Sequence, residues 1–400
     1  MQRNRNQERI DNMNKPGGNM KKISFLGAGL FFFAAVLGAE VVNEDRPLKG
    51  EWNFAPRKIW ETSTAGEEVL TRLSAIRTDR KDNIYVFDIR HARFFVFSPD
   101  GQFRYAFGRK GEGPGEYRMA FTFFVLEERI IVPDMNRILF FDTRGNFIRS
   151  RIPGGSYIFP RTFVDRNRFV YVPAGVEENQ ADDQVKLVDL ETGKQQLLFE
   201  IPAEKMLAGT VESGGNQMRL NIKDSNTTPG VIIACRAGDL YLGKNDEYRI
   251  RKMDLRGNEE LVFSIEGRQR NPITLETKRK RLEGITFNGG RMPEAMIRQM
   301  INAMPDRCTH FNRLWVDANG HVYVFISDLA DDTVQKIDIF SPGGRYLYRA
   351  NLGLPESYRM DPGTIDFTDR FLYVFAEDEE GEGRLVKYQV RPVPASNETD

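Results

Sequence analysis

The chain has 400 residues, enough for a large core, and its length alone would allow two or three domains. Lys and Arg total 57, as do Asp and Glu, so no net charge directs the protein to nucleic acid or to an anionic membrane. Two cysteines exclude a disulfide framework and leave either one bridge or two thiols.

The amino-terminal segment is predicted to lie outside the folded domain. Residues 1–19 are polar and aperiodic, which predicts disorder or a misassigned start codon. Residues 20–39 combine two lysines, an uncharged apolar run and a small-residue end, the pattern of a secretory signal peptide. The run is short for a membrane span, which needs about 20 residues, although an uncleaved single-span anchor stays open. We therefore expect a secreted or periplasmic protein, with residues 40–56 as a linker.

A repeated pattern of strands and turns follows this linker. Its clearest copy, residues 82–116, contains DNIYVFD, then RFFVFSPDGQFRYAFG, then RKGEGPGE. The β-branched and aromatic runs are typical of strands buried on both faces. The SPDG string places Pro where a φ of about −65° suits a turn and Gly where a positive φ is cheap. The unit therefore predicts three strands and a shaped loop that leads to the next unit.

Two kinds of turn recur with different frequencies. The polar turn between the first and second strands occurs six times, at 80–83, 127–129, 165–168, 236–239, 317–320 and 368–370. The turn between the third and fourth strands occurs five times, at 98–101, 142–145, 189–193, 254–257 and 341–344.

Units of about 40–50 residues with four strands each indicate a β-propeller. The mismatch between the two counts predicts six blades, with residues 57–60 supplying the fourth strand of the last blade. The predicted fold is therefore an all-β, six-bladed β-propeller over residues 57–391, followed by a tail at 392–400.

These strings, with RLWVDANGHVYVF at 313–325, resemble the bacterial secreted six-bladed β-propeller proteins related to NHL-repeat propellers. FGRKGEGPGE is the most specific piece, and the similarity extends over residues 55–390. The resemblance implies the fold and an extracytoplasmic setting. It supplies no catalytic residues, because most members have no assigned activity. Many relatives carry a lipid-anchoring cysteine after the signal peptide, and this chain has none there.

An insertion, residues 272–305, lengthens the spacing between the fourth and fifth units. Thr274 is placed to cap a helix that runs through Leu282. Pro293 suits the first turn of a second helix, residues 294–304, which carries one apolar stripe. Inserted segments in repeat folds often lie on the binding face, but a hairpin that merely covers a blade would have the same pattern.

Chemistry-bearing residues are sparse. The sequence has no G-x-S-x-G elbow, P-loop or dinucleotide fingerprint in a suitable context. Acidic loops between second and third strands would suit calcium or a cationic partner, or would form a solvated rim. His310, just before the innermost strand of the fifth unit, is the first candidate for a site at the central channel, although an incidental role stays open. The candidate ligand-binding residues are His310, Arg161, Asp328, Asp331 and Asp332.

The glycine-rich string is predicted to be a structural loop that leads the chain between two blades. A phosphate site is disfavoured because a strand, rather than a helix, should follow it. The residues of this loop are Gly108, Gly111, Gly113, Pro114, Gly115 and Glu116. A disulfide between Cys235 and Cys308 stays open beside two free thiols.

We expect a monomer that binds a small ligand or another envelope protein, without nucleic acid, and that meets a membrane only if the signal segment is retained. Calcium is the one cofactor suggested. The alternatives are a metal-dependent lyase or lactonase-like enzyme with its site at the central channel, and a structural component of a larger assembly. The three histidines have no metal-ligand spacing, so a metal site would have to be assembled from separate blades.

Overall fold

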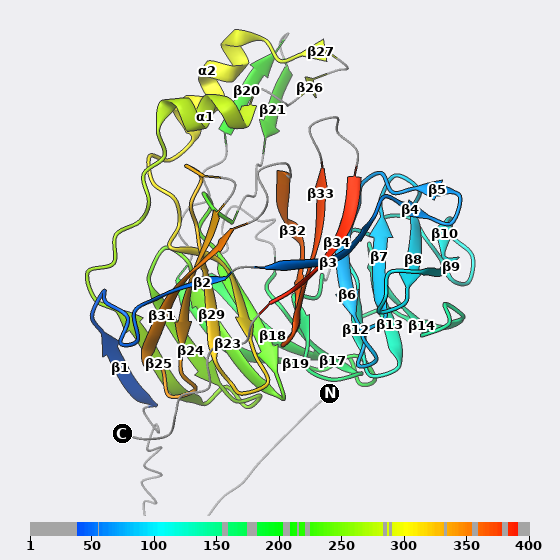
Figure 1. Ribbon diagram of the computed structural model, residues 1–400, viewed down its shortest axis with the longest axis horizontal. Helices are drawn as coiled ribbons and strands as arrows, with labels where there is room; N and C mark the ends of the chain where they lie inside the picture. The colour runs from blue at the N-terminus through cyan, green and yellow to red at the C-terminus, as the bar shows by residue number, and fades with distance from the viewer. Residues whose placement is uncertain are drawn as a thin grey trace, which may run out of the picture. The chain divides into compact units, whose positions relative to one another are not determined.

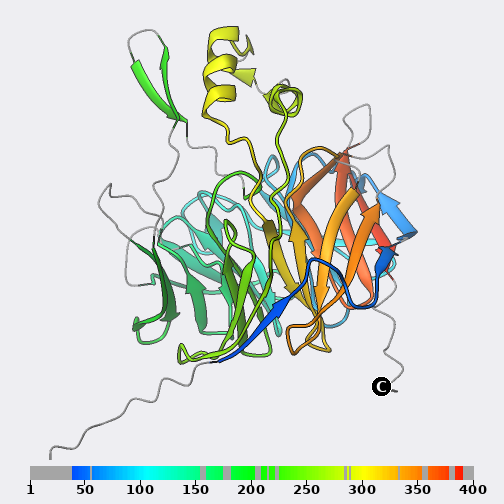
Figure 2. The same ribbon diagram turned by 90° about the vertical axis from the view of Figure 1, so that its left-hand side faces the viewer.

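A computed structural model describes residues 38–390, except for positions 55, 154–158, 174–181, 203–208, 214–215, 221–224, 283–285, 288–289, 332–333, 354–358 and 378–382. These residues form a ring of six blades, each a β-sheet of four or five strands, so the predicted six-bladed β-propeller is confirmed (Figures 1 and 2). Within this part of the chain, no helix is both long and apolar enough to span a bilayer.

Each blade begins with its innermost strand and continues outward through antiparallel neighbours. The first three blades consist of β6 (Leu73–Thr78), β7 (Ile84–Asp88), β8 (Arg93–Phe97) and β9 (Phe103–Phe107); β12 (Phe124–Leu126), β13 (Arg129–Asp134), β14 (Arg137–Asp142) and β15 (Phe147–Arg151); and β16 (Thr162–Phe163), β17 (Arg168–Tyr171), β18 (Asp182–Asp189) and β19 (Gln195–Pro202).

The last three blades are built in the same way. They consist of β22 (Val231–Arg236), β23 (Asp239–Lys244), β24 (Arg249–Met253) and β25 (Glu259–Ile265); β28 (Phe311–Val316), β29 (Val322–Ile326), β30 (Val334–Phe340) and β31 (Tyr346–Gly353); and β32 (Arg359–Phe367), β33 (Phe371–Glu377), β34 (Gly383–Gln389) and β3 (Arg57–Thr62).

The hydrophobic core lies between neighbouring blades, because the middle strands bury both of their faces. Every residue of β7 is buried, as the continuous apolar run predicts. One cluster joins blade 1 to blade 2: the Phe94 ring stacks on Phe107 at 4.8 Å and meets Phe123 of the next blade edge-on at 5.1 Å.

In several of the polar turns, an aspartate binds the backbone of its own turn. Asp79 accepts hydrogen bonds from the N–H groups of Lys81 and Asn83 at 2.8 and 2.9 Å, and the Asn83 side chain donates to it at 2.8 Å. The same arrangement recurs at the aspartates of other turns, which are Asp142, Asp254 and Asp317. This local bonding satisfies the turn without help from the rest of the fold.

The ring is closed by an amino-terminal strand, as the turn counts predict. β3 pairs antiparallel with β34 and so forms the outermost strand of blade 6. The Trp60 indole N–H donates to Pro99 O at 3.1 Å, and Lys387 Nζ donates to the same carbonyl at 2.8 Å. Gly101 of that turn has a φ of +87°, and a Cβ there would lie 2.7 Å from the Trp60 ring. Blade 6 is thereby joined to blade 1.

The segment predicted as a linker, 40–56, contains two β-strands. β1 (Ala39–Asn43) adds a fifth, parallel strand to the outer edge of blade 4, and β2 (Glu51–Phe54) does the same for blade 5. The sequence analysis missed these strands because they are short and their strand patterns are weak. They cover two sheet edges that would otherwise present unpaired backbone groups.

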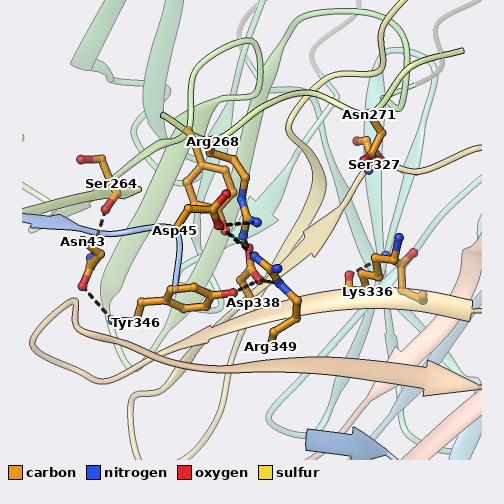
Figure 3. A network of polar contacts seen from close by, with 12 residues as sticks. Asn43, Asp45, Ser264, Arg268, Asn271, Ser327, Lys336, Asp338, Tyr346 and Arg349 are labelled. Atoms are coloured by element: carbon orange, nitrogen blue, oxygen red, sulfur yellow. Dashed lines mark hydrogen bonds and ion pairs between the residues drawn. The ribbon is translucent and has the colours of Figure 1, made fainter. Parts of the chain in front are cut away.

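A charged network fastens this amino-terminal segment to the ring (Figure 3). Buried Asp338 accepts hydrogen bonds from the hydroxyls of Tyr248 and Tyr346 at 2.7 and 2.5 Å and is paired with Arg268. Asp45 accepts from Arg268 at 2.7 Å and from Arg349 at 2.9 Å. Two arginines and two aspartates balance, so this cluster carries no excess charge.

The insertion contains the two predicted helices, α1 (Leu275–Leu282) and α2 (Glu294–Ala303). Thr274 caps α1, since its hydroxyl accepts from the Thr277 N–H at 3.1 Å. Short strand pairs complete the described structure. They are β4 (Thr64–Ala65) with β5 (Glu68–Val69), β10 (Arg109–Lys110) with β11 (Glu116–Tyr117), β20 (Gly209–Ser213) with β21 (Asn216–Leu220), and β26 (Thr286–Phe287) with β27 (Gly290–Arg291).

Candidate functional site

In several blades, a buried polar side chain lies at the end of the second strand. It accepts a hydrogen bond from the backbone of the segment that leads into the innermost strand of the same blade. Asp88 accepts from the Thr71 N–H at 2.8 Å in blade 1, and Asp134 accepts from the Met119 N–H at 2.8 Å in blade 2. Asn245 plays the same part in blade 4. Because these groups are buried, each lost bond would leave an unsatisfied polar atom. The face of the ring on which these connections lie is therefore held rigidly.

Blades 4 and 5 extend this arrangement into a hydrogen-bonded network that joins the stems of two insertions. One is the β20–β21 hairpin between blades 3 and 4, and the other is the helical insertion between blades 4 and 5. Asn245 Nδ2 donates to Ser225 O at 2.9 Å, and Thr309 Oγ1 donates to the same carbonyl at 2.6 Å. The hydroxyls of Thr309 and Ser327 lie 2.8 Å apart, and Asn271 Nδ2 donates to Ser327 O at 2.9 Å (Figure 3). Ser225 follows the β20–β21 hairpin, whereas Asn271 and Thr309 flank the helical insertion. One hydrogen-bonded network therefore supports both insertions, and we call it the insertion base.

His310 belongs to the insertion base. Its backbone N–H donates to Asn245 O at 2.7 Å, and its carbonyl accepts from the Ser327 N–H at 3.2 Å. The imidazole packs edge-on against Tyr248, with 5.7 Å between the ring centroids. The structure thus places the first candidate residue at the start of an innermost strand, beside the insertion stem.

The surroundings of His310 keep its imidazole neutral. Burial, followed by the positive charges of Arg270 and Arg268, lowers the pKa of His310 to about 4, although Asp246 acts in the opposite direction. Nδ1 has no hydrogen-bond partner among the described residues. A neutral imidazole with a free ring nitrogen is able to bind a ligand group, but its position alone assigns no chemistry.

The other candidate residues lie apart in the ring. Arg161 is an exposed residue just before β16 of blade 3, and its backbone N–H donates to Val170 O at 2.8 Å. Asp328 of blade 5 binds Lys336 Nζ at 3.0 Å and its own loop through the Ala330 N–H at 3.0 Å. Asp331 is exposed, and Asp332 lies outside the described residues.

The predicted acidic loops fall largely on positions 174–181 and 378–382, outside the described residues. Among the residues that are described, no three His, Cys, Asp or Glu side chains are grouped to hold a metal ion. Calcium binding therefore stays a prediction.

The glycine-rich loop binds its own carboxylate. Glu116 accepts from the Gly113 N–H at 2.9 Å and from Arg109 Nε at 2.6 Å, and these two bonds lower the pKa of its carboxyl. A Cβ on Gly111 would lie 2.1 Å from that carboxylate. The Glu116 carboxylate thus occupies the Gly113 N–H, a donor that a phosphate would otherwise use, and the structural role of the loop stays a prediction.

Neither cysteine forms a disulfide bond. Cys235 lies near the end of β22, whereas Cys308 precedes β28, and the two innermost strands run in the same direction. The two sulfurs therefore lie at opposite ends of neighbouring strands, about 20 Å apart by strand length. A disulfide needs Cα atoms within about 7 Å, so the bridge left open by the sequence is not formed.

The helical insertion has a small apolar core of its own, made of Leu282, Met292, Met296, Met300 and Ile301 with Ile297 at its edge. None of these residues comes from a blade. α2 also contacts β20 of the other insertion. The two insertions therefore lie beside each other on one side of the ring (Figures 1 and 2).

Sequence analysis missed three charged residues on the innermost strands: Arg77 on β6, Arg313 on β28 and Asp366 on β32. Each is partly exposed. The signal that could have found them is a charge within a strand whose other residues are mostly apolar.

Comparison with known proteins supports the architecture. A family model described as a six-bladed β-propeller, DUF5128, matches residues 62–221. No curated protein matches the sequence.

Among solved structures, a protein from Bacteroides fragilis described as exported aligns at 13% identity over 88% of this chain and 100% of its own, with a TM-score of 0.50. A member of the DUF4221 family from Bacteroides vulgatus aligns at 10% identity over 85% of this chain and 97% of its own, with a TM-score of 0.52. At such identities the likeness concerns the fold alone.

Proposed function

We propose that the protein is an extracytoplasmic binding module whose ligand or partner docks on the face that carries the two insertions. The observation that carries this proposal is the separate core of α1 and α2. A hairpin that served only to cover a blade would share the apolar core of that blade, whereas the core of this insertion consists of its own residues.

The buried base of the insertions supports the same proposal. Buried polar atoms need hydrogen-bond partners. The polar atoms of Asn245, Thr309 and Ser327 find these partners in bonds that join the two insertion stems. A binding surface built on such a rigid base loses little conformational entropy when a ligand docks.

The extracytoplasmic setting rests on the signal-like pattern of residues 20–39, and the exported description of the Bacteroides fragilis protein agrees with it. A monomer that meets a small ligand or another envelope protein is part of the proposal. No observation favours the metal-dependent lyase or lactonase.

The test replaces residues 274–305 by Asn-Gly. The excision is clean because the Ile273 N–H donates to Asp306 O at 2.8 Å and Pro272 pairs with Arg307, so a two-residue turn can close the stem. Thermal unfolding is then measured with a panel of amino acids, sugars, nucleotides and divalent cations. At least one ligand that stabilises the complete chain should fail to stabilise the excised variant, because its docking face has been removed.

Arg236→Gln is the matched control. It removes an ion pair with Asp369 at 3.1 Å. This pair lies at the end of the innermost strands away from the insertion stems, so its loss should leave ligand stabilisation unchanged. The proposal is contradicted if no member of the panel stabilises the complete chain, or if the excised variant responds equally to all of them.

A further inference from the structure

Three charged side chains meet across three adjacent innermost strands. Arg313 of blade 5 reaches blade 6, where its Nη1 donates to Ile365 O at 2.8 Å. The Thr78 hydroxyl of blade 1 donates to Asp366 Oδ2 of blade 6 at 3.4 Å. Arg77, next to Thr78, donates from Nη1 to Ile76 O at 2.6 Å. Asp366 of blade 6 thus lies between arginines from the two neighbouring blades.

The charges of this group do not balance. Two guanidinium groups face one carboxylate, and among the described residues neither arginine forms a direct ion pair with a carboxylate. This differs from the Asp338 cluster, where each arginine touches an aspartate. Placing like charges together without paired counter-charges is costly in a partly dry setting.

Asp366 and Arg313 both have shifted pKa values. Burial raises the pKa of the Asp366 carboxyl above its usual value, although Arg77 and Arg313 both act against the rise. Burial, together with the charge of Arg77, lowers the pKa of Arg313 to about 10, so this guanidinium remains charged at neutral pH even though Asp366 opposes the fall. The group is therefore positive at pH 7.

The arginines are held in place by aromatic rings. The Arg77 guanidinium lies over Phe123 at 6.0 Å, and that of Arg313 lies over Phe325 at 5.5 Å. A guanidinium has five N–H donors, and each arginine uses one of them on a backbone carbonyl. Most of the donors therefore remain for an acceptor, on side chains whose planes are already oriented.

We propose that Arg77 and Arg313 form a subsite for a small oxyanion at the centre of the ring, with Asp366 as the built-in competitor for the same positive charge. The flat fork of a guanidinium matches both carboxylate and phosphate oxygens, which is the chemistry that the two ligand types share. This inference rests on the proposed binding function and adds the class of ligand that would bind at the centre of the ring.

Titration calorimetry of the complete chain with inorganic phosphate and, separately, with succinate tests the proposal at pH 7 and constant ionic strength. We expect saturable binding of at least one anion above a sodium chloride control. Binding of phosphate alone or of succinate alone supports the site and identifies the source of the oxyanion. Arg313→Gln and Arg77→Gln should each weaken binding about tenfold or more, because hydrogen bonds between charged groups are lost.

Asp366→Asn provides the discriminating variant. If the group binds an anion, removal of the competing carboxylate should strengthen anion binding several-fold, whereas a purely structural group would show only lower stability. Arg236→Gln removes an arginine from another innermost strand and should leave anion affinity unchanged. The inference is overturned if neither anion binds, or if Asp366→Asn weakens binding as much as the arginine variants do.

Replacement of residues 274–305 separates this inference from the proposed function. Oxyanion binding at the ring centre should survive that excision. If no oxyanion binds but another ligand binds in a way that depends on the insertion, the subsite is refuted and the proposed function is not.

Discussion

At the scale of single residues, most buried polar side chains hold the backbone. The half-buried His321 ring instead contacts the carboxylate of such a turn: its Nδ1 lies 3.0 Å from Asp317 Oδ2, in the place that Asn83 Nδ2 takes beside Asp79 at 2.8 Å. His310 differs, because its backbone is bonded on both sides while its Nδ1 is left without a partner in the described structure. Titration of His310 should therefore change the stability of the folded protein more than titration of the other two histidines.

Replacing His310 by Gln should flatten the pH dependence of stability between pH 6.5 and 4. The pKa of His310 is about 4 in the folded protein and about 6.5 in the unfolded chain. In that window the unfolded chain binds more protons, so the wild type loses stability as the pH falls, by less than about 1.4 kcal/mol per pH unit because His310 is partly exposed.

Urea unfolding from pH 4.5 to 8 measures this difference. Above pH 7 both proteins should have the same pH dependence, which serves as the internal control. Parallel curves throughout the acidic window would show that His310 is not held neutral.

At the scale of elements, the insertion is a small cooperative unit beside the ring. Lys278 on α1 is buried, and its Nζ donates to Met304 O and to Asp306 Oδ1, both at 2.8 Å. These bonds tie the first helix to the end of the second. The sequence places Lys278 in a basic run, where it would be expected to face solvent.

Lys278→Ala should therefore loosen the insertion while leaving the ring intact. The expected loss is about 1–3 kcal/mol of local stability, because the Met304 carbonyl loses its charged donor. Hydrogen exchange should become faster in α1 and α2 and stay unchanged in β7 and β8. Arg279→Ala, on the exposed side of the same helix, is the control and should change neither. Uniformly faster exchange in both the ring and the insertion would contradict a separate unit.

At the scale of the whole molecule, stability depends on how the ends of the ring meet. The core between blades 6 and 1 joins Tyr373, Phe375 and Leu385 to residues of β6 and β7, with Trp60 of β3 packed against it. β1 and β2, by comparison, add strands to edges of blades that already have four.

Chains that begin after Phe54 and after Thr62 should differ sharply. Loss of β1 and β2 should lower the melting temperature by several degrees, about 2–4 °C for each kcal/mol. Further loss of β3 leaves β34 as an open edge and removes Trp60, so this shorter chain should aggregate or unfold. Calorimetry and size-exclusion chromatography measure both effects. Equal melting temperatures for the two truncated chains would contradict closure by β3.

The sequence by itself determined the architecture, because a propeller repeats local chemistry. Alternating apolar strands and self-bonded aspartate turns need only their own few residues, so the six turns and the missing fourth strand could be counted. The cap at Thr274 and the stripe on α2 were equally local, and both helices were found where expected.

Only the tertiary structure decided which distant residues meet. β1 and β2 have weak strand patterns and form because blades 4 and 5 offer open edges. Arg77, Arg313 and Asp366 are separated by up to 289 positions in the chain, and no local pattern relates them. They come together because ring closure places the first blade beside the last. That closure is a long-range contact, and local sequence patterns cannot specify which side chains it brings into one group.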